Sequence, residues 1–157
     1  MDDRDGRTAG FTLIEMVCVL AVVALMAAVS LPAMSRQTSR PRLEAYALET
    51  ASLLKADRNA AIGRGLAVNT RVDARARLIS AGASRQVIRL PDDVRLETVL
   101  PRNCDDRPSF ESISFFGSGM SCGGVITLTH LDAGYQIRVN WLTGRVEVGS
   151  HAGVTRP

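Results

Sequence analysis

The longest feature of the hydropathy pattern is an apolar run near the N-terminus, from Phe11 to Leu31. Its 21 residues, FTLIEMVCVLAVVALMAAVSL, contain one charged residue, Glu15. As a helix that rises about 1.5 Å per residue, the run would measure roughly 30 Å, which matches the hydrocarbon thickness of a bilayer. A helix that packs on a globular core usually keeps a polar face, and this run has none. We therefore predict a transmembrane helix over residues 11–31 in preference to a buried core helix.

The next segment, residues 32–65, is predicted to continue the helix in amphipathic form. Pro32 should kink or loosen it, because proline lacks the backbone N–H and clashes with the preceding turn. From residue 43 onward, apolar positions approximate one stripe that should pack on a sheet: Leu43, Tyr46, Ala47, Ala51, Leu54, Ala61 and Ile62. Gly63 and Gly65 predict the helix end, since glycine accepts the left-handed cap conformation.

The remainder, residues 66–157, is predicted to be a β-rich globular domain. Short stretches rich in Val, Ile, Leu and Thr alternate there with turn residues. The expected strands are 66–72, 85–90, 94–100, 112–116, 124–129, 135–141 and 145–148. The last two form the clearest hairpin, with Gly144 free to take a positive φ in the turn.

Composition narrows the function classes only slightly. The chain has 157 residues, enough for one core, with 19 basic and 16 acidic side chains; all but one of the basic residues are arginine. This small excess of positive charge is weak evidence for a polyanionic partner. Solvated surface positions explain most of the arginines, and an acidic partner patch is the minority alternative.

Glu15 is the most informative single residue of the apolar run. An ionised carboxylate inside a bilayer costs about 2.5 to 3.5 kcal/mol on insertion scales, so its presence indicates a function. A cleaved secretory signal peptide is the main alternative for this segment, with Ala27-Ala28-Val29-Ser30 imitating a cleavage site. The length of the run and the acid within it disfavour that alternative.

The residues Gly10-Phe11-Thr12-Leu13-Ile14-Glu15, followed by the long apolar run, resemble the signal of type IV prepilins. That motif is shared by pilins and by the pseudopilins of type II secretion. The resemblance implies that a membrane-embedded prepilin peptidase removes residues 1–10 by cutting after Gly10 and methylates the new N-terminal Phe11. No cofactor is expected.

This mapping gives Glu15 a role in assembly. Cleavage would create an α-amino group with a reference pKa near 8, four residues before Glu15 and on the same helical face. In a filament, Glu15 could instead meet the terminal amine of a neighbouring subunit and so fix the axial register. The leader departs from the usual basic pattern because it carries three aspartates. Arg4 and Arg7 still favour a cytoplasmic N-terminus in the inner membrane and a periplasmic C-terminal domain.

Three distal segments are similar to the GspH/FimT group of minor pseudopilins: 60–65, 113–126 and 142–146. The group implies an α+β, pilin-like fold in which a long N-terminal helix packs on an antiparallel β-domain. It also implies a non-enzymatic subunit at or near the tip of a type II secretion pseudopilus, with membrane lipid, other major and minor pseudopilins and secreted substrate as partners. The alternative is a minor type IV pilin that acts in pilus assembly or DNA uptake. Some of those bind DNA through a Gly-Arg-any-Arg stretch, and here Glu147 replaces the second arginine after Gly144 and Arg145, which disfavours DNA.

Cysteine placement is consistent with this topology. Cys18 lies in the apolar run, whereas Cys104 and Cys122 lie in the expected periplasmic domain. Because the periplasm is oxidising, we expect these two to form a disulfide, which would contribute about 3 kcal/mol by restricting the unfolded chain. The alternative, that both remain free thiols, stays open.

Catalytic and metal chemistry have little support in the sequence. The cysteines and histidines fit no compact ligand motif, and Ser118 between two glycines indicates a turn rather than a nucleophile elbow. We therefore expect no catalytic residue and no metal site, and a single-span membrane enzyme is the weakest alternative. Calcium at Asp105 and Asp106 stays open, because two carboxylates are too few to define a site.

Overall fold

The computed structural model describes residues 11–30, 38–105, 107–109 and 111–152. Its contacts divide the chain into two units, residues 1–36 and residues 37–157. The described residues of the first unit include helix α1 (Leu13–Ser30). Gly10 and Pro32 lie outside the described residues, so the cleavage site and the kink remain predictions.

The second unit begins with helix α2 (Arg40–Arg64). Pro41 occupies the first turn, where its missing N–H costs nothing. The helix ends at Arg64 because Gly65 adopts the left-handed conformation, with φ of 65°. The predicted end at the glycines is therefore correct for Gly65.

Ten strands follow α2 in the described residues, arranged in two four-stranded antiparallel sheets and one short pair. The first sheet has the order β3-β2-β1-β7, and the second has the order β10-β9-β8-β4. β5 pairs with β6. The bounds are β1 (Val68–Asp73), β2 (Leu78–Ser80), β3 (Val87–Arg89), β4 (Arg95–Val99), β5 (Asn103–Cys104), β6 (Arg107–Pro108), β7 (Ser112–Phe115), β8 (Gly124–His130), β9 (Ala133–Val139) and β10 (Val146–Ala152).

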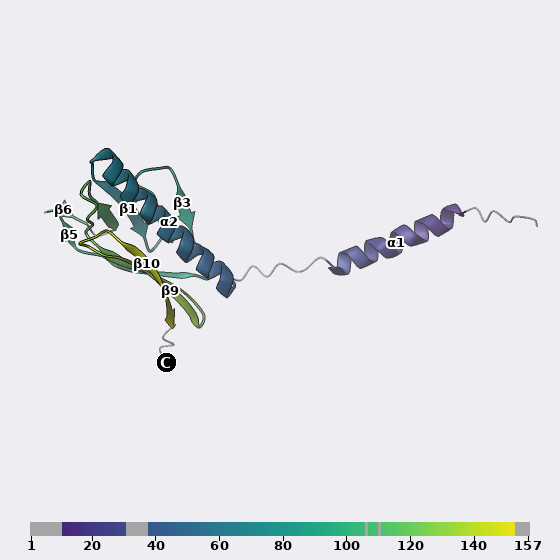
Figure 1. Ribbon diagram of the computed structural model, residues 1–157. Helices are drawn as coiled ribbons and strands as arrows, with labels where there is room; N and C mark the ends of the chain where they lie inside the picture. The colour runs from purple at the N-terminus through teal and green to yellow at the C-terminus, as the bar shows by residue number, and fades with distance from the viewer. Residues whose placement is uncertain (1–10, 31–37, 106, 110, 153–157) are drawn as a thin grey trace, which may run out of the picture. The chain divides into compact units, whose positions relative to one another are not determined.

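One core fills the space between α2 and the two sheets. Figure 1 shows α2 lying along the strands, and it contacts strands of both sheets. Leu43 and Leu54 of α2 are fully buried with Phe115 of one sheet and Ile137 of the other. Burial of one such side chain stabilises the fold by about 1.5 to 3 kcal/mol. The expected α+β architecture, a helix packed on antiparallel sheets, is confirmed.

Several details differ from the sequence expectations. Ile62 was expected on the buried stripe but is exposed, because it lies about 100° around the helix from buried Ala61. Leu66 precedes β1 and is also exposed. The strands β2, β5 and β6 were not predicted, since runs of two or three residues are too short to show a period.

Candidate functional site

Helix α1 carries the first candidate site, at its N-terminal end. Phe11 precedes the helix and is exposed, and Glu15 lies in the first turn. A carboxylate there is favourable, because the helix dipole places partial positive charge at the N-terminus. The carbonyl of Thr12, just before the helix, accepts hydrogen bonds from the N–H groups of Glu15 and Met16. The end of the helix therefore presents an aromatic residue and an acid together.

The rest of α1 carries an exposed apolar surface. All of its described side chains, residues 13–26, are exposed, among them Leu13, Leu20 and Leu25. An apolar surface of this extent indicates an interaction partner rather than a free existence in water. No helix in the described part of the chain is long and apolar enough to cross a membrane. Cys18 on this helix is a free thiol.

Asp57 is the residue that sequence reasoning missed most clearly. It is almost fully buried in α2, and its carboxylate accepts hydrogen bonds from Thr70 Oγ1 at 2.6 Å, Gly82 N at 2.8 Å and Ala83 N at 2.9 Å. These bonds join α2 to β1 and to the loop before β3. The signal was present in the sequence, because Asp57 lies three residues after Leu54 and four before Ala61, within the apolar stripe.

Arg58, the next residue of α2, holds two loops by hydrogen bonds. Its Nε donates to the carbonyl of Gly119 at 3.2 Å, and its Nη2 donates to the carbonyl of Thr143 at 2.9 Å. Gly144 has a φ of 61°, as the hairpin prediction expected, and a Cβ there would collide with the Gly119 carbonyl oxygen. The residue pattern alone gives Arg58 no role, whereas in the structure its hydrogen bond to Thr143 fixes the β9–β10 turn.

The disulfide joins Cys104 of β5 to Cys122, which precedes β8. The two Cα atoms are 5.7 Å apart, within the range typical of disulfides. The bridge ties the short β5–β6 pair to the second sheet. It pairs the two cysteines for which the sequence analysis expected a bridge.

A cluster at the start of the globular unit connects the entry of α2 to the sheet. The Asp93 carboxylate accepts two hydrogen bonds from Thr38, one from the backbone N–H at 2.7 Å and one from the hydroxyl at 2.9 Å. His130 Nδ1 lies 2.8 Å from the Asp93 carbonyl oxygen. The Thr38 backbone hydrogen bond, aided by the Thr38 hydroxyl and the nearby His130, lowers the pKa of the Asp93 carboxyl below its usual value.

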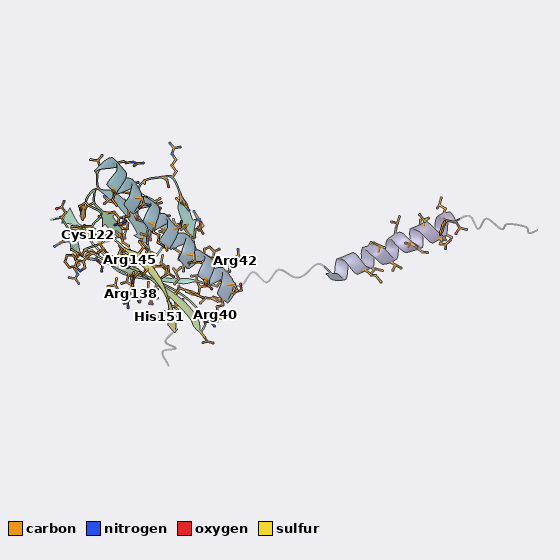
Figure 2. The ribbon with its side chains drawn as sticks, in the orientation of Figure 1. Arg40, Arg42, Cys122, Arg138, Arg145 and His151 are labelled. Atoms are coloured by element: carbon orange, nitrogen blue, oxygen red, sulfur yellow. A yellow bond between two sulfur atoms is a disulfide. The ribbon has the colours of Figure 1, made fainter. Side chains whose placement is uncertain are left out.

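A surface groove of about 920 Å³ lies beside the turn between β9 and β10. Arg58, Arg138 and Arg145 line it together with Glu147 and Trp141. Arg138 faces Glu147 across the two strands, and Arg145 Nε lies 3.6 Å from Glu147 Oε1. Arg138 and Arg145 lie in the β9–β10 part of the globular unit (Figure 2).

Metal-binding groups do not gather in the described part of the chain, where no three His, Cys, Asp or Glu side chains form a candidate metal site. Asp105 is exposed in a turn with φ of 52°, and Asp106 lies outside the described residues. The structure therefore adds no support for calcium at this loop.

Comparison with known proteins gives three findings. Residues 6–31 match the prokaryotic N-terminal methylation motif. Over 140 residues the chain is 30% identical to the type II secretion system protein H of Xanthomonas campestris pv. campestris. The aligned region covers 89% of this chain and 82% of that protein. In this comparison the similarity extends well beyond the N-terminal helix, into the globular unit.

Solved structures agree on the fold. The minor pseudopilin EpsH of the Vibrio cholerae type 2 secretion system matches with a TM-score of 0.54 and 14% identity, over 68% of this chain and 95% of that one. The type IV minor pilin FimU of Pseudomonas aeruginosa matches with a TM-score of 0.53 and 14% identity, over 71% of this chain and 91% of that one. The two scores are nearly equal, so the fold alone does not separate the secretion protein from the pilus protein.

Proposed function

The chain belongs to the family of type II secretion system protein H, and from this premise we propose that it is a minor pseudopilin at or near the tip of a pseudopilus. In this role it helps to export folded proteins across the outer membrane by assembly rather than by catalysis. The observation that carries the proposal is the 30% identity to protein H across 89% of the chain, because it includes the globular unit as well as the N-terminal motif.

The N-terminal motif supports processing by a prepilin peptidase. The match over residues 6–31 includes Gly10 and Phe11, the residues on either side of the proposed cut. The side chain of Phe11 is exposed and precedes the first helical residue, Leu13, by two positions. Cleavage there would leave the new amino group beside the N-terminal end of α1, next to Glu15.

We propose that the segment 11–31 anchors the protein in the inner membrane as a single span before assembly. The run in the sequence extends beyond both ends of α1, and at about 1.5 Å per residue its 21 residues suffice for a bilayer. Arg4 and Arg7 favour a cytoplasmic N-terminus, which places the globular unit in the periplasm. The disulfide between Cys104 and Cys122 agrees with an oxidising compartment.

The same helix would then become the assembly element. Pseudopilins that pack laterally need small residues for close approach, and Ala21 and Ala24 supply them on α1. Glu15 would be neutralised by a terminal amine, in its own chain or in the adjacent subunit. A helix inserted in the wrong register would leave that carboxylate unpaired in an apolar environment, which costs several kcal/mol.

The minor type IV pilin remains the alternative function, and one experiment separates the two. The gene for this chain would be deleted in frame in its own host, and export of type II substrates, twitching motility and DNA uptake would be measured side by side. We expect loss of export with motility and DNA uptake retained, and restoration by the intact gene. Loss of motility or DNA uptake with normal export would reverse the assignment.

A further inference from the structure

The groove beside the β9–β10 turn has features of a binding site that the anchoring and assembly of α1 do not use. Trp141, the only tryptophan of the chain, is 63% exposed at its edge. The adjacent Leu142 is also exposed. Tryptophan and arginine are enriched among the residues that contribute most to protein–protein binding, and both occur here.

The turn that carries Trp141 is held firmly. The Trp141 carbonyl accepts from the N–H of Ser121 at 2.9 Å, next to the disulfide at Cys122. The Asn140 side chain accepts from the N–H groups of Leu142 and Thr143, both at 3.0 Å. Arg58 of α2 donates to the carbonyl of Thr143. An exposed aromatic residue on a turn held in this way loses little conformational freedom when it binds a partner.

The charges of the groove indicate the chemistry of that partner. Three arginines, Arg58, Arg138 and Arg145, line the groove with a single acid, Glu147, so the lining carries a net charge of +2. Lys55 adds a further cation in the adjoining hollow, which shares Arg58, Arg145 and Glu147. Glu147 lies opposite Arg138 in the β9–β10 ladder, and its Oε1 is 3.6 Å from Arg145 Nε.

This arrangement favours a few carboxylates over a nucleic acid. A polyanionic backbone is bound by many cations that follow its phosphates, and an acid in their midst repels it. One or two carboxylates can instead pair with Arg138 and Arg145 on either side of Glu147, because guanidinium groups bind carboxylates well. Trp141 would pack against an apolar side chain of the partner that lies next to these carboxylates.

We propose that the groove binds an acidic segment of a partner protein, in which carboxylates flank an apolar side chain. This inference rests on the proposed function, in which the globular unit contacts other proteins of the secretion apparatus or their cargo. It adds the binding surface and the chemistry of the segment that the surface recognises.

The test uses the full-length protein in a neutral detergent and a synthetic decapeptide of alternating Glu and Leu, labelled with fluorescein. Peptide anisotropy measures binding, and the fluorescence of Trp141 reports whether binding occurs at the groove. We expect saturable binding that changes the Trp141 signal, weakens with added salt and is at least about ten-fold tighter than binding of the matching Lys-Leu peptide.

Two double variants locate the effect. Arg138→Gln with Arg145→Gln should weaken binding of the Glu-Leu peptide by about ten-fold or more. Arg71→Gln with Arg89→Gln removes the same number of exposed charges from the other sheet and should leave binding unchanged. Thermal unfolding of both variants checks that any loss reflects binding and not folding.

Three outcomes would overturn the inference: no saturable response to the Glu-Leu peptide, equal weakening by both double variants, or tighter binding of a twelve-nucleotide single-stranded DNA than of the peptide. The third outcome would identify the groove as a nucleic-acid site. The failure of this proposal is distinguishable from failure of the proposed function, because the deletion experiment on export does not depend on peptide binding.

Discussion

The two helices of this protein differ in whether their apolar side chains are buried. The described side chains of α1 are all exposed, although nearly all are apolar, whereas α2 buries Leu43, Leu54 and Ala61 against its own sheets. α2 carries acids and bases on its other faces, and α1 has Glu15 alone. The packing partner of α2 is therefore encoded within its own unit, whereas the exposed apolar surface of α1 indicates an interaction partner, which we propose to be membrane lipid before assembly and other subunits after it.

The two helices also differ in how their acidic residues Asp57 and Glu15 are paired. Asp57 of α2 is buried and satisfied by three hydrogen bonds from its own chain. Glu15 of α1 is exposed, and in our proposal it meets a terminal amine, of its own chain or of an adjacent subunit, only after cleavage. Changes in α2 should therefore alter folding, and changes in or before α1 should alter maturation and assembly without altering the stability of the globular unit.

The largest effect is expected for Gly10→Leu. A bulky side chain should prevent the backbone from entering the peptidase cleft, so essentially all of the protein should remain as uncut precursor in the membrane fraction. The shift in mass on an immunoblot measures this. Gly6→Leu is the matched control, since it places the same side chain in the leader away from the cut. Normal maturation of Gly10→Leu would show that the cut lies elsewhere.

Asp57→Ala should produce the largest loss of stability within the globular unit. The change removes three hydrogen bonds and leaves the buried Thr70 hydroxyl and the partly buried N–H groups of Gly82 and Ala83 without their acceptor, at a cost of about 3 kcal/mol. Chemical denaturation monitored by Trp141 fluorescence measures it. Glu49→Ala, at an exposed position of the same helix, should change stability by less than about 0.5 kcal/mol. Similar losses for the two variants would contradict the role given to Asp57.

Glu15→Ala should leave both maturation and the stability of the globular unit intact. We expect its incorporation into pseudopili to fall by about ten-fold, because loss of one charge-assisted pair weakens docking by roughly 1.4 kcal/mol or more. Sheared pseudopili analysed by immunoblot give the amount incorporated. Thr12→Ala, in the same N-terminal segment, serves as the control. Undiminished incorporation of Glu15→Ala would remove its role in register.

The smallest effect is expected for Asp93→Asn, at the entry to α2. Because the pKa of Asp93 is lowered in the folded protein, its carboxylate stabilises the fold above its unfolded pKa of about 3.9. That contribution is lost as the pH falls through the lower folded pKa. Asp93→Asn should thus reduce the melting temperature modestly at pH 7, and the difference should shrink as the pH falls below the unfolded pKa and vanish below the lower folded pKa. A difference that is constant with pH would show that the charge is irrelevant.

The sequence predicted those parts of the fold that have a regular period or a conformationally special residue. The apolar run located α1, Gly65 located the end of α2, and Gly144 located the β9–β10 turn. Each of these signals is local: a run of apolar residues, or a glycine that accepts a positive φ.

The parts that were not predicted depend on contacts between distant residues. The place of Asp57 in the apolar stripe indicates burial, but its hydrogen-bond partners, the Thr70 hydroxyl and the N–H groups of Gly82 and Ala83, lie far along the chain. Arg58 is bound by carbonyls more than 60 residues away. The two-residue strands β5 and β6 have no period at all and lie next to the disulfide. Local patterns carry no information about such partners.

The mass of the native protein's N-terminal peptide, isolated from membranes of its own host, tests the central claim most directly. The account predicts a chain that begins at Phe11 and carries one methyl group on its amino nitrogen. An intact terminus at Met1, in cells with an active prepilin peptidase, would contradict the assignment of α1 as a processed assembly helix.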